Sequence, residues 1–328
     1  MTNTNRDATC HMVDRILKFL KTWSLPVAMI VGALAYVSYR IITPLHPYAA
    51  DLAGCVSFIQ PLLIFLMLFL SFCKVDPHQL RLHRYHFLLL TVQVVFFLLS
   101  AALVYMLGAS PAVPAVESFM LCMICPTATA AVVVTSRLGG NTAGLAVYTM
   151  LINLVVAVCV PLVIPLLHPQ EGRTFLLSFS LIVGRVFPTL IGPFLAAVLL
   201  RRLWPSLHRR ICALSGLAFR LWAVSLALAI AMSARSLYHT QSSACILPGI
   251  ALASLLSCIL QFWIGRRIGK AAGCPICCAQ SLGQKNTVLA IWMGYTFLTP
   301  VVSIAGGFYS IWHNVYNAWQ LAHQGKQK

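Results

Sequence analysis

Two short polar strings interrupt a chain that is otherwise apolar, and their side chains are the ones that could do chemistry. The first follows Pro126 and contains Thr127 and Thr129. The second places amide, hydroxyl, glycine and amine groups side by side, in the order Gln280-Ser-Leu-Gly-Gln-Lys-Asn-Thr287. Groups of these types bind an ion or a small polar molecule. General acid-base chemistry is disfavoured, because the whole chain has only 6 Asp and Glu residues to supply carboxylates.

The composition indicates an all-α integral membrane protein. Of the 328 residues, 60% are hydrophobic and 9% charged, whereas a soluble domain carries about a quarter charged residues. The formal net charge of +17 does not indicate nucleic-acid binding, since the cations are scattered between long apolar stretches and form no basic face.

Windows of the length that crosses a bilayer, roughly 20 apolar residues, predict ten transmembrane spans. An odd number of spans per half inverts the second half, so we expect a first five-helix repeat over 23–168 and an inverted second one over 169–321. The segments 1–22 and 322–328 flank them. The ten spans lie near 23–43, 52–73, 86–107, 113–135, 142–167, 174–200, 213–234, 244–265, 272–298 and 301–321.

The distribution of Lys and Arg predicts the orientation. The ends of the spans on one side carry 17 of these cations and the ends on the other side carry 3. Cytoplasmic loops are enriched in positive charge, so both termini are expected in the cytoplasm of a cell-membrane protein. The first 22 residues lack the apolar run of a signal peptide.

The two polar strings fall within the fourth span of each half. Polar groups at membrane depth are costly unless they line a cavity. Interrupted helices at equivalent places in two inverted halves are typical of secondary transporters, in which the breaks meet near the midplane and bind the substrate. We therefore predict a transporter whose site lies at the crossing of helices four and nine.

Several local strings resemble the bile acid:sodium symporter family. They are Phe65-Leu-Met-Leu-Phe-Leu-Ser-Phe-Cys-Lys-Val-Asp-Pro77, Cys125-Pro-Thr-Ala-Thr-Ala-Ala131 and Gly283-Gln-Lys-Asn286. The resemblance implies panel and core domains, with helices four and nine broken. It also implies alternating-access transport of an organic anion, such as a bile acid, a steroid sulfate or a small carboxylate, commonly with sodium.

The sodium ligands that this resemblance implies are altered here. The family's Ser-Asn pair in helix four corresponds to Ala131 and Val132, and its helix-nine Glu and Gln correspond to Ser281 and Lys285. An ammonium about 4 Å from a sodium ion repels it by about 4 kcal/mol at an effective dielectric of about 20. Sodium coupling is therefore doubtful.

Lys285 is a substitute for the cation in this interpretation. Its amine is expected to bond to Ser281, Asn286, Thr127 or Thr129, with Gln284 beside it. Because burial makes charging an amine costly, Lys285 could bind and release a coupling proton; it could also act as a fixed internal cation, contact the anionic substrate, or pair structurally.

Other polar residues inside the spans are further candidates for the site. Arg185 could help bind an anion or pair with Glu117, the only acid within a span. Asn153 lies near the family's helix-five ligands, although interhelical hydrogen bonding is the default for it and for Gln93. His313 and Asn314 are candidates for a cavity wall. No histidine spacing indicates a metal site.

Two groups of closely spaced cysteines are the remaining residues that could do chemistry. Cys122 with Cys125, and Cys274 with Cys277 and Cys278, have spacings that can bind metal or do redox chemistry, but packing as small apolar residues is favoured.

A non-transporting membrane sensor on a transporter fold stays open as an alternative function. A lipid-modifying enzyme is disfavoured because its best residues are ordinary loop histidines and aspartates. We expect no cofactor, and partners limited to a small organic anion and membrane lipid.

Overall fold

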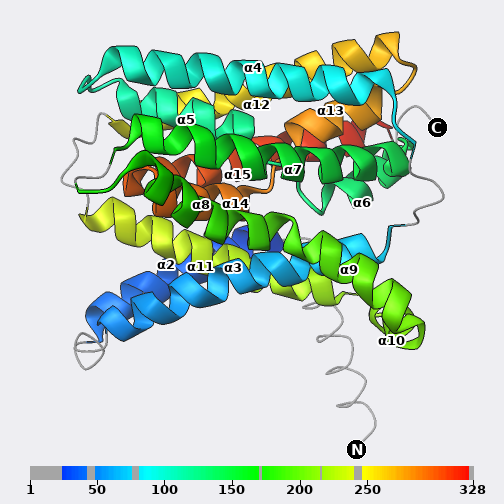
Figure 1. The fold of residues 1–328 in the computed structure, drawn as a ribbon, viewed down its shortest axis with the longest axis horizontal. Helices are drawn as coiled ribbons and strands as arrows, with labels where there is room; N and C mark the ends of the chain where they lie inside the picture. The colour runs from blue at the N-terminus through cyan, green and yellow to red at the C-terminus, as the bar shows by residue number, and fades with distance from the viewer. Residues whose placement is uncertain are drawn as a thin grey trace, which may run out of the picture.

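The computed structural model describes residues 24–42, 49–75, 81–169, 172–214, 216–239 and 246–324, and in this part of the chain the regular elements are helices. Figure 1 shows them lying side by side along the long axis of the molecule. The first four are α2 (Ser24–Ile41), α3 (Ala49–Cys73), α4 (Arg84–Leu107) and α5 (Val113–Ile124). They are followed by α6 (Ala131–Arg137), α7 (Thr142–Leu167), α8 (Phe175–Leu190), α9 (Gly192–Leu203), α10 (Pro205–Cys212), α11 (Leu217–His239), α12 (Ile246–Ala271), α13 (Pro275–Gly283), α14 (Thr287–Phe297), the 3₁₀ turn η3 (Pro300–Ser303) and α15 (Ile304–Gln324).

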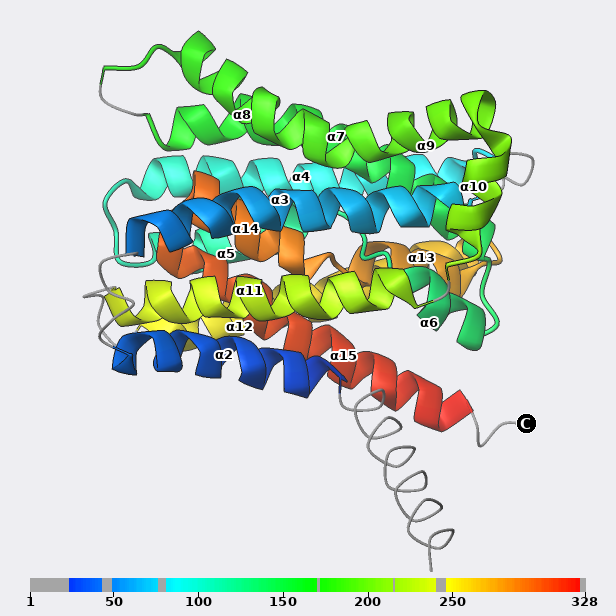
Figure 2. The same cartoon turned by 90° about the horizontal axis from the view of Figure 1, so that it is seen from below.

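The helices pack in two groups. In one, α11 packs against both α2 and α3, and α3 packs against α8 and α9; α2 and α11 lie side by side in Figure 2. In the other, α12 contacts α5, α13 and α15, while α4 contacts α5 and α7. The groups meet where α7 packs on α8 and where α11 packs on α14 and η3.

The surface of the helices is apolar, as a lipid-facing surface must be. On α4, for example, Leu99 is 61% exposed and Met106 81% exposed. Among the described residues, four helices are long and apolar enough to cross a membrane: 54–73, 84–107, 142–167 and 246–271. Counting the bent pair α8 and α9 as one span raises that number to 5. The helix bounds lie close to those expected from the sequence, but the ten-span inverted repeat itself stays a prediction.

The sixth expected span, 174–200, is not a straight helix. It consists of α8 and α9, whose axes are bent by 43° at Ile191. Pro188 lies inside α8, and a proline within a helix removes one backbone hydrogen bond and kinks the axis. The sequence predicted a span there but not this bend.

The two predicted breaks occur in the structure, and local chemistry explains them. Cys125 precedes Pro126 and has an extended backbone with ψ 133°, the conformation favoured before proline, so α5 ends at Ile124. On the other side, α13 starts with Pro275 at its first turn, and Asn286 starts α14 by accepting the backbone N–H of Leu289 at 3.2 Å.

Close packing places the second break against α12. A Cβ atom at Gly265 would lie 2.5 Å from the carbonyl oxygen of Cys278, and one at Gly269 would lie 2.6 Å from Cα of Pro275. Two glycines four residues apart on one membrane helix let the backbone of a second helix approach closely. A side chain at Gly283 would likewise collide with the ring of Phe262, 2.4 Å away.

Candidate functional site

The two helix breaks cross in the middle of the molecule and pair through their backbones. Thr127 and Lys285 form an isolated antiparallel bridge. The N–H of Ala128 donates to the carbonyl of Gln284, and the N–H of Asn286 donates to the carbonyl of Pro126, both at 2.8 Å. The polar strings singled out in the sequence therefore meet at one place. Backbone groups that the breaks release from helical bonding satisfy one another there, as membrane burial requires.

Lys285 is buried at this crossing. Its side chain is 1% exposed, and its Nζ donates to the carbonyl oxygen of Met123 at 3.2 Å. The expected partners Ser281, Asn286, Thr127 and Thr129 are not the ones it uses. Met123 belongs to the last turn of α5, whose carbonyls have no helical partner and carry the negative end of the helix dipole. The amine therefore caps the C-terminus of a half-helix.

Side chains from neighbouring helices cap the remaining carbonyls at the crossing. Thr127 Oγ donates to the carbonyl of Ser281 at 2.7 Å. Gln93 Nε2, from α4, donates to the carbonyls of Ile124 and Cys125, both at 3.0 Å. The crossing is thus held by donors from the chain itself.

Gln–Tyr pairs support both half-helices, and the sequence-based interpretation missed most of this network. Tyr148 Oη donates to Gln93 Oε1 at 2.6 Å. On the other side, Gln261 Nε2 donates to Tyr309 Oη at 3.1 Å, and Tyr309 Oη donates to the carbonyl of Gly283 at 2.8 Å. Gln93 was expected to bond between helices and does. Gln261 carries the same signal, an amide in an apolar helix.

A cavity of about 540 Å³ opens beside the crossing. Its inner wall includes Thr129, Gln284 and Asn314, and Lys74 lies on its rim, while most of the lining is apolar. The volume is typical of a small-molecule site. It lies between the two helix groups, since its walls come from α3 and α11 on one side and from α6, α7 and α15 on the other. Its remaining lining residues are Leu70, Ser71, Val75, Ala130, Val132, Val133, Val134, Thr142, Ala143, Ala146, Ala218 and Trp222.

Comparison with protein families identifies the family of this chain. A model described as the SBF-like CPA transporter family matches residues 28–323, almost the whole chain. The chain belongs to this family. The match confirms the resemblance to bile acid:sodium symporters. The comparison with curated proteins gives no match.

In this SBF-like transporter, the structure places the candidate residues in different surroundings. Thr129, Gln284 and Asn314 line the cavity, and Thr127, Ser281, Lys285 and Asn286 are buried at the crossing. Asn153 is buried on α7, where its Nδ2 donates to the carbonyl of Thr149 at 2.8 Å, within its own helix. The ring of His313 lies edge-on to Tyr309, with centroids 5.6 Å apart. Neither Asn153 nor His313 is among the residues that line the cavity.

Arg185 does not take the position expected for it. It is exposed on α8 and does not line the described cavity. Its suggested partner Glu117 is engaged elsewhere. Arg185 therefore has no place in the site described here.

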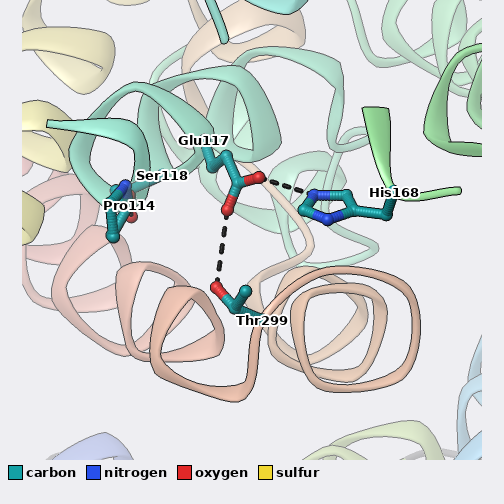
Figure 3. Close-up of polar contacts among 5 residues, drawn as sticks. All are labelled: Pro114, Glu117, Ser118, His168 and Thr299. Carbon is teal, nitrogen blue, oxygen red and sulfur yellow. Dashed lines mark hydrogen bonds and ion pairs between the residues drawn. The ribbon is translucent and has the colours of Figure 1, made fainter. Parts of the chain in front are cut away.

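Glu117 forms a separate cluster at the other end of α5. Its side chain is fully buried, and Oε1 lies 2.6 Å from Nε2 of His168, while Thr299 Oγ donates to Oε2 at 3.4 Å. Figure 3 shows the carboxylate between these two partners. The cluster joins the end of α7 and the segment after α14 to α5, so it fixes the end of the bundle opposite the cavity.

At the crossing of this family member, the chain itself occupies most of the groups that could bind a cation. The carbonyls at the breaks already accept hydrogen bonds from the chain, and an amine takes that of Met123. Two buried side-chain oxygens, Ser281 Oγ and Gln284 Oε1, have no hydrogen-bond partner in the described structure. They are uncharged, and both precede Lys285 in the same polar string. In the described part of the chain, no group of three or more His, Cys, Asp or Glu residues could hold a metal ion.

Proposed function

We propose that this chain is a secondary transporter for a small organic anion with an apolar body, such as a bile acid, a steroid-like acid or a small carboxylate. Membership of a transporter family and the apolar helices support the class of protein. The cavity supports the substrate: its lining is mainly apolar, and its polar members include Thr129, Gln284 and Asn314 together with the exposed Lys74.

The observation that carries the proposal is the position of Lys285 directly behind this polar wall. Gln284, which lines the cavity, is its neighbour in the chain, and the amine is held on the Met123 carbonyl. A fixed positive charge in a medium of low dielectric attracts an anion strongly. We propose that Lys285 supplies the positive charge that a bound cation would otherwise provide, so that transport needs no sodium.

The arrangement of the two helix groups supports alternating access. The cavity lies between them, and the crossing forms its inner wall. With the orientation expected from Lys and Arg, its mouth opens to the cytoplasm. Movement of the group that contains α5, α13 and α15 against the group that contains α3 and α11 would expose the same wall to the other side. The ten spans would then form two inverted repeats.

The ion dependence is tested with purified protein in liposomes. Uptake of a conjugated bile acid and of a small 2-oxo acid is measured with sodium or potassium as the only added cation. We expect equal uptake of the transported anion in both salts. Uptake that requires a sodium gradient would overturn the sodium-free mechanism, and uptake of organic cations alone would overturn the anion assignment.

The role of Lys285 is tested by Lys285→Gln, with Lys270→Gln as the matched control. Lys270 is exposed at the end of α12. We expect at least a tenfold loss of uptake in Lys285→Gln and none in the control. Unchanged uptake in Lys285→Gln would contradict the proposal.

The cavity is tested by filling it. Val133 is 57% exposed and lines the cavity, whereas Val158 is 51% exposed on α7 and does not. Val133→Trp should abolish uptake and Val158→Trp should leave it intact, with both variants folded by thermal denaturation. Equal uptake in the two variants would show that the substrate passes elsewhere.

Proton coupling is a second candidate, favoured by one observation. An ammonium has three N–H donors, and the described structure gives Nζ of Lys285 one acceptor, Met123. An amine with so few partners can exist without its proton. If it carries the coupling proton, an imposed pH gradient should drive accumulation in the original chain, while residual uptake by Lys285→Gln should not respond to the gradient.

A further inference from the structure

Three cysteines lie together at the start of α13, in the string Cys274-Pro-Ile-Cys-Cys278. Sγ of Cys274 lies 3.5 Å from Sγ of Cys278. Cys274 is partly exposed, whereas Cys277 and Cys278 are buried. All three are free thiols, so the cluster combines one accessible thiol with a buried thiol in contact with it.

The backbone makes this contact possible. Cys274 precedes the helix and has φ −138° and ψ 60°, outside the helical region, so its side chain turns back over the first turn, toward Cys278. The N–H of Cys278 donates to the carbonyl of Cys274 at 3.1 Å, which holds the two residues together. A disulfide needs the sulfurs about 2.05 Å apart, so Sγ of Cys274 has only to move by about 1.5 Å.

The neighbouring helices enclose the buried thiols. A Cβ at Gly269 of α12 would lie 2.9 Å from Cβ of Cys278, and one at Gly144 of α7 would lie 3.3 Å from Sγ of Cys277 and 2.3 Å from Oη of Tyr85. Cys277 therefore points toward α7 and Tyr85, and its side chain also interacts with that of Cys278. The sulfur–sulfur contact of 3.5 Å joins Cys278 to Cys274, and this contact selects the pair.

Another cysteine pair, Cys122 and Cys125, has the three-residue spacing of Cys274 and Cys277 but is arranged differently. Cys122 and Cys125 are both buried, and their sulfurs face separate carbonyls, those of Ala305 at 4.0 Å and Asn286 at 3.0 Å. This pair packs as small apolar residues do. The spacing alone is thus not what distinguishes the cluster on α13.

We propose that Cys274 and Cys278 form a thiol oxidation site whose oxidant is a peroxide. Cys274 gives up its thiol proton, and the thiolate attacks one oxygen of hydrogen peroxide. The O–O bond breaks, the leaving hydroxide takes up that proton and departs as water, and Cys274 becomes a sulfenic acid. Sγ of Cys278 then attacks this sulfur as its proton passes to the departing hydroxyl, which leaves as a second water. Two thiols are oxidised to one disulfide, and one peroxide is reduced to two waters.

The disulfide would act as a reversible switch. With the orientation expected above, the start of α13 faces the cytoplasm, where thiols are normally kept reduced, so the bond forms under oxidation and is reversed by a dithiol. It ties down the first turn of the half-helix that leads to Gln280, Ser281 and Gln284. We expect a several-fold slower uptake; this last step rests on the proposed transport function, whereas the oxidation itself does not.

One tryptic peptide reports the chemistry directly. Cleavage after Lys270 and Lys285 releases residues 271–285, which contain these three cysteines and no other. The full chain in detergent is treated with hydrogen peroxide, denatured, labelled with N-ethylmaleimide and digested. We expect the peptide to have lost two hydrogens and to carry one label, on Cys277. Three labels, a label on Cys274 or Cys278, or a sulfinic acid at Cys274 would overturn the proposal.

Variants check the pair and separate it from transport. Cys277→Ser should still form the disulfide, and Cys278→Ser should not. Disulfide formation in Cys278→Ser but not in Cys277→Ser would assign the bond to Cys277 and overturn the pair. In liposomes, peroxide should slow uptake by the original chain and dithiothreitol should restore it, with no effect on Cys274→Ser. A disulfide without any change in the uptake of an active transporter would overturn the switch alone; absence of uptake before oxidation would instead contradict the proposed function.

Discussion

Lys285 and Glu117 are two ionisable side chains buried in the same bundle, and their partners are of different kinds. Both act on α5: Lys285 Nζ binds the Met123 carbonyl at its C-terminal end, and Glu117 lies in its N-terminal half. Each charge has the sign that the nearer end of the helix dipole favours. The dipole acts mainly within the first and last turns of a helix. Met123 lies in the last turn of α5, whereas Glu117 lies outside the first turn.

This difference explains the partners. Lys285 is held by a backbone carbonyl in the last turn, with no carboxylate partner in the described structure. Glu117 is one residue beyond the first turn, so it needs His168 and Thr299. We therefore expect the pair at the end opposite the cavity to serve stability and the amine at the crossing to serve the proposed transport. The variants below test that division.

The largest loss of stability is expected from His168→Leu. It leaves the Glu117 carboxylate buried with Thr299 alone, and removing one partner of a buried pair costs about 3 kcal/mol; we take this low value because the His168 side chain is 31% exposed. Thermal denaturation in detergent measures the free energy of unfolding. The double variant Glu117→Leu with His168→Leu should recover most of the loss. No recovery would show that His168 acts through packing and not through the carboxylate.

A smaller loss, about 2 kcal/mol, is expected from Gln93→Met. The similar apolar side chain leaves the carbonyls of Ile124 and Cys125 and the hydroxyl of Tyr148 without their partner. Each of these three neutral hydrogen bonds contributes about 0.7 kcal/mol net. Tyr148→Phe, which removes one donor, is the matched control and should cost less. An equal cost in both variants would mean that Gln93 acts mainly through Tyr148.

The sequence predicted which residues meet at the crossing better than it predicted their hydrogen-bond partners. The polar strings around Thr127 and Lys285 predicted a meeting of two breaks, because polar groups at membrane depth need one another. The acceptor for Lys285 was missed, since it is the backbone carbonyl of Met123 and no residue type indicates it. The side on which a residue lies was also unknown: neighbouring residues on a helix point about 100° apart, so Asn314 lines the cavity and His313 does not.

Arg185 and the bend between α8 and α9 show the same limit. A position near the middle of an apolar span predicts depth, but it does not predict the face of the helix, and Arg185 is exposed. Pro188 was visible in the sequence, yet prolines such as Pro61 lie inside helices that stay continuous. Packing against neighbours decides which proline bends its helix.

Lys285→Met should separate stability from transport. The apolar side chain leaves one carbonyl, that of Met123, without its donor and leaves no unpaired charge, so the cost in unfolding free energy is about 1–2 kcal/mol. Uptake should nevertheless fall at least tenfold, because the internal cation is gone. A stability loss as large as that of His168→Leu, with uptake reduced only in proportion to folded protein, would contradict the division between the two charges.

The smallest effect, about 1 kcal/mol or less, is expected from Thr127→Val. Valine keeps the shape of threonine but removes the donor to the Ser281 carbonyl, one neutral hydrogen bond. The backbone pairing of the two breaks stays intact, because it uses the N–H groups of Ala128 and Asn286. Thr135→Val, whose hydroxyl is buried without a hydrogen-bond partner in the described structure, is the control and should cost less or stabilise. If Thr127→Val cost as much as Gln93→Met, the crossing would depend on this hydroxyl more than on its backbone bridge, and Lys285 would be positioned by Thr127 as well as by Met123.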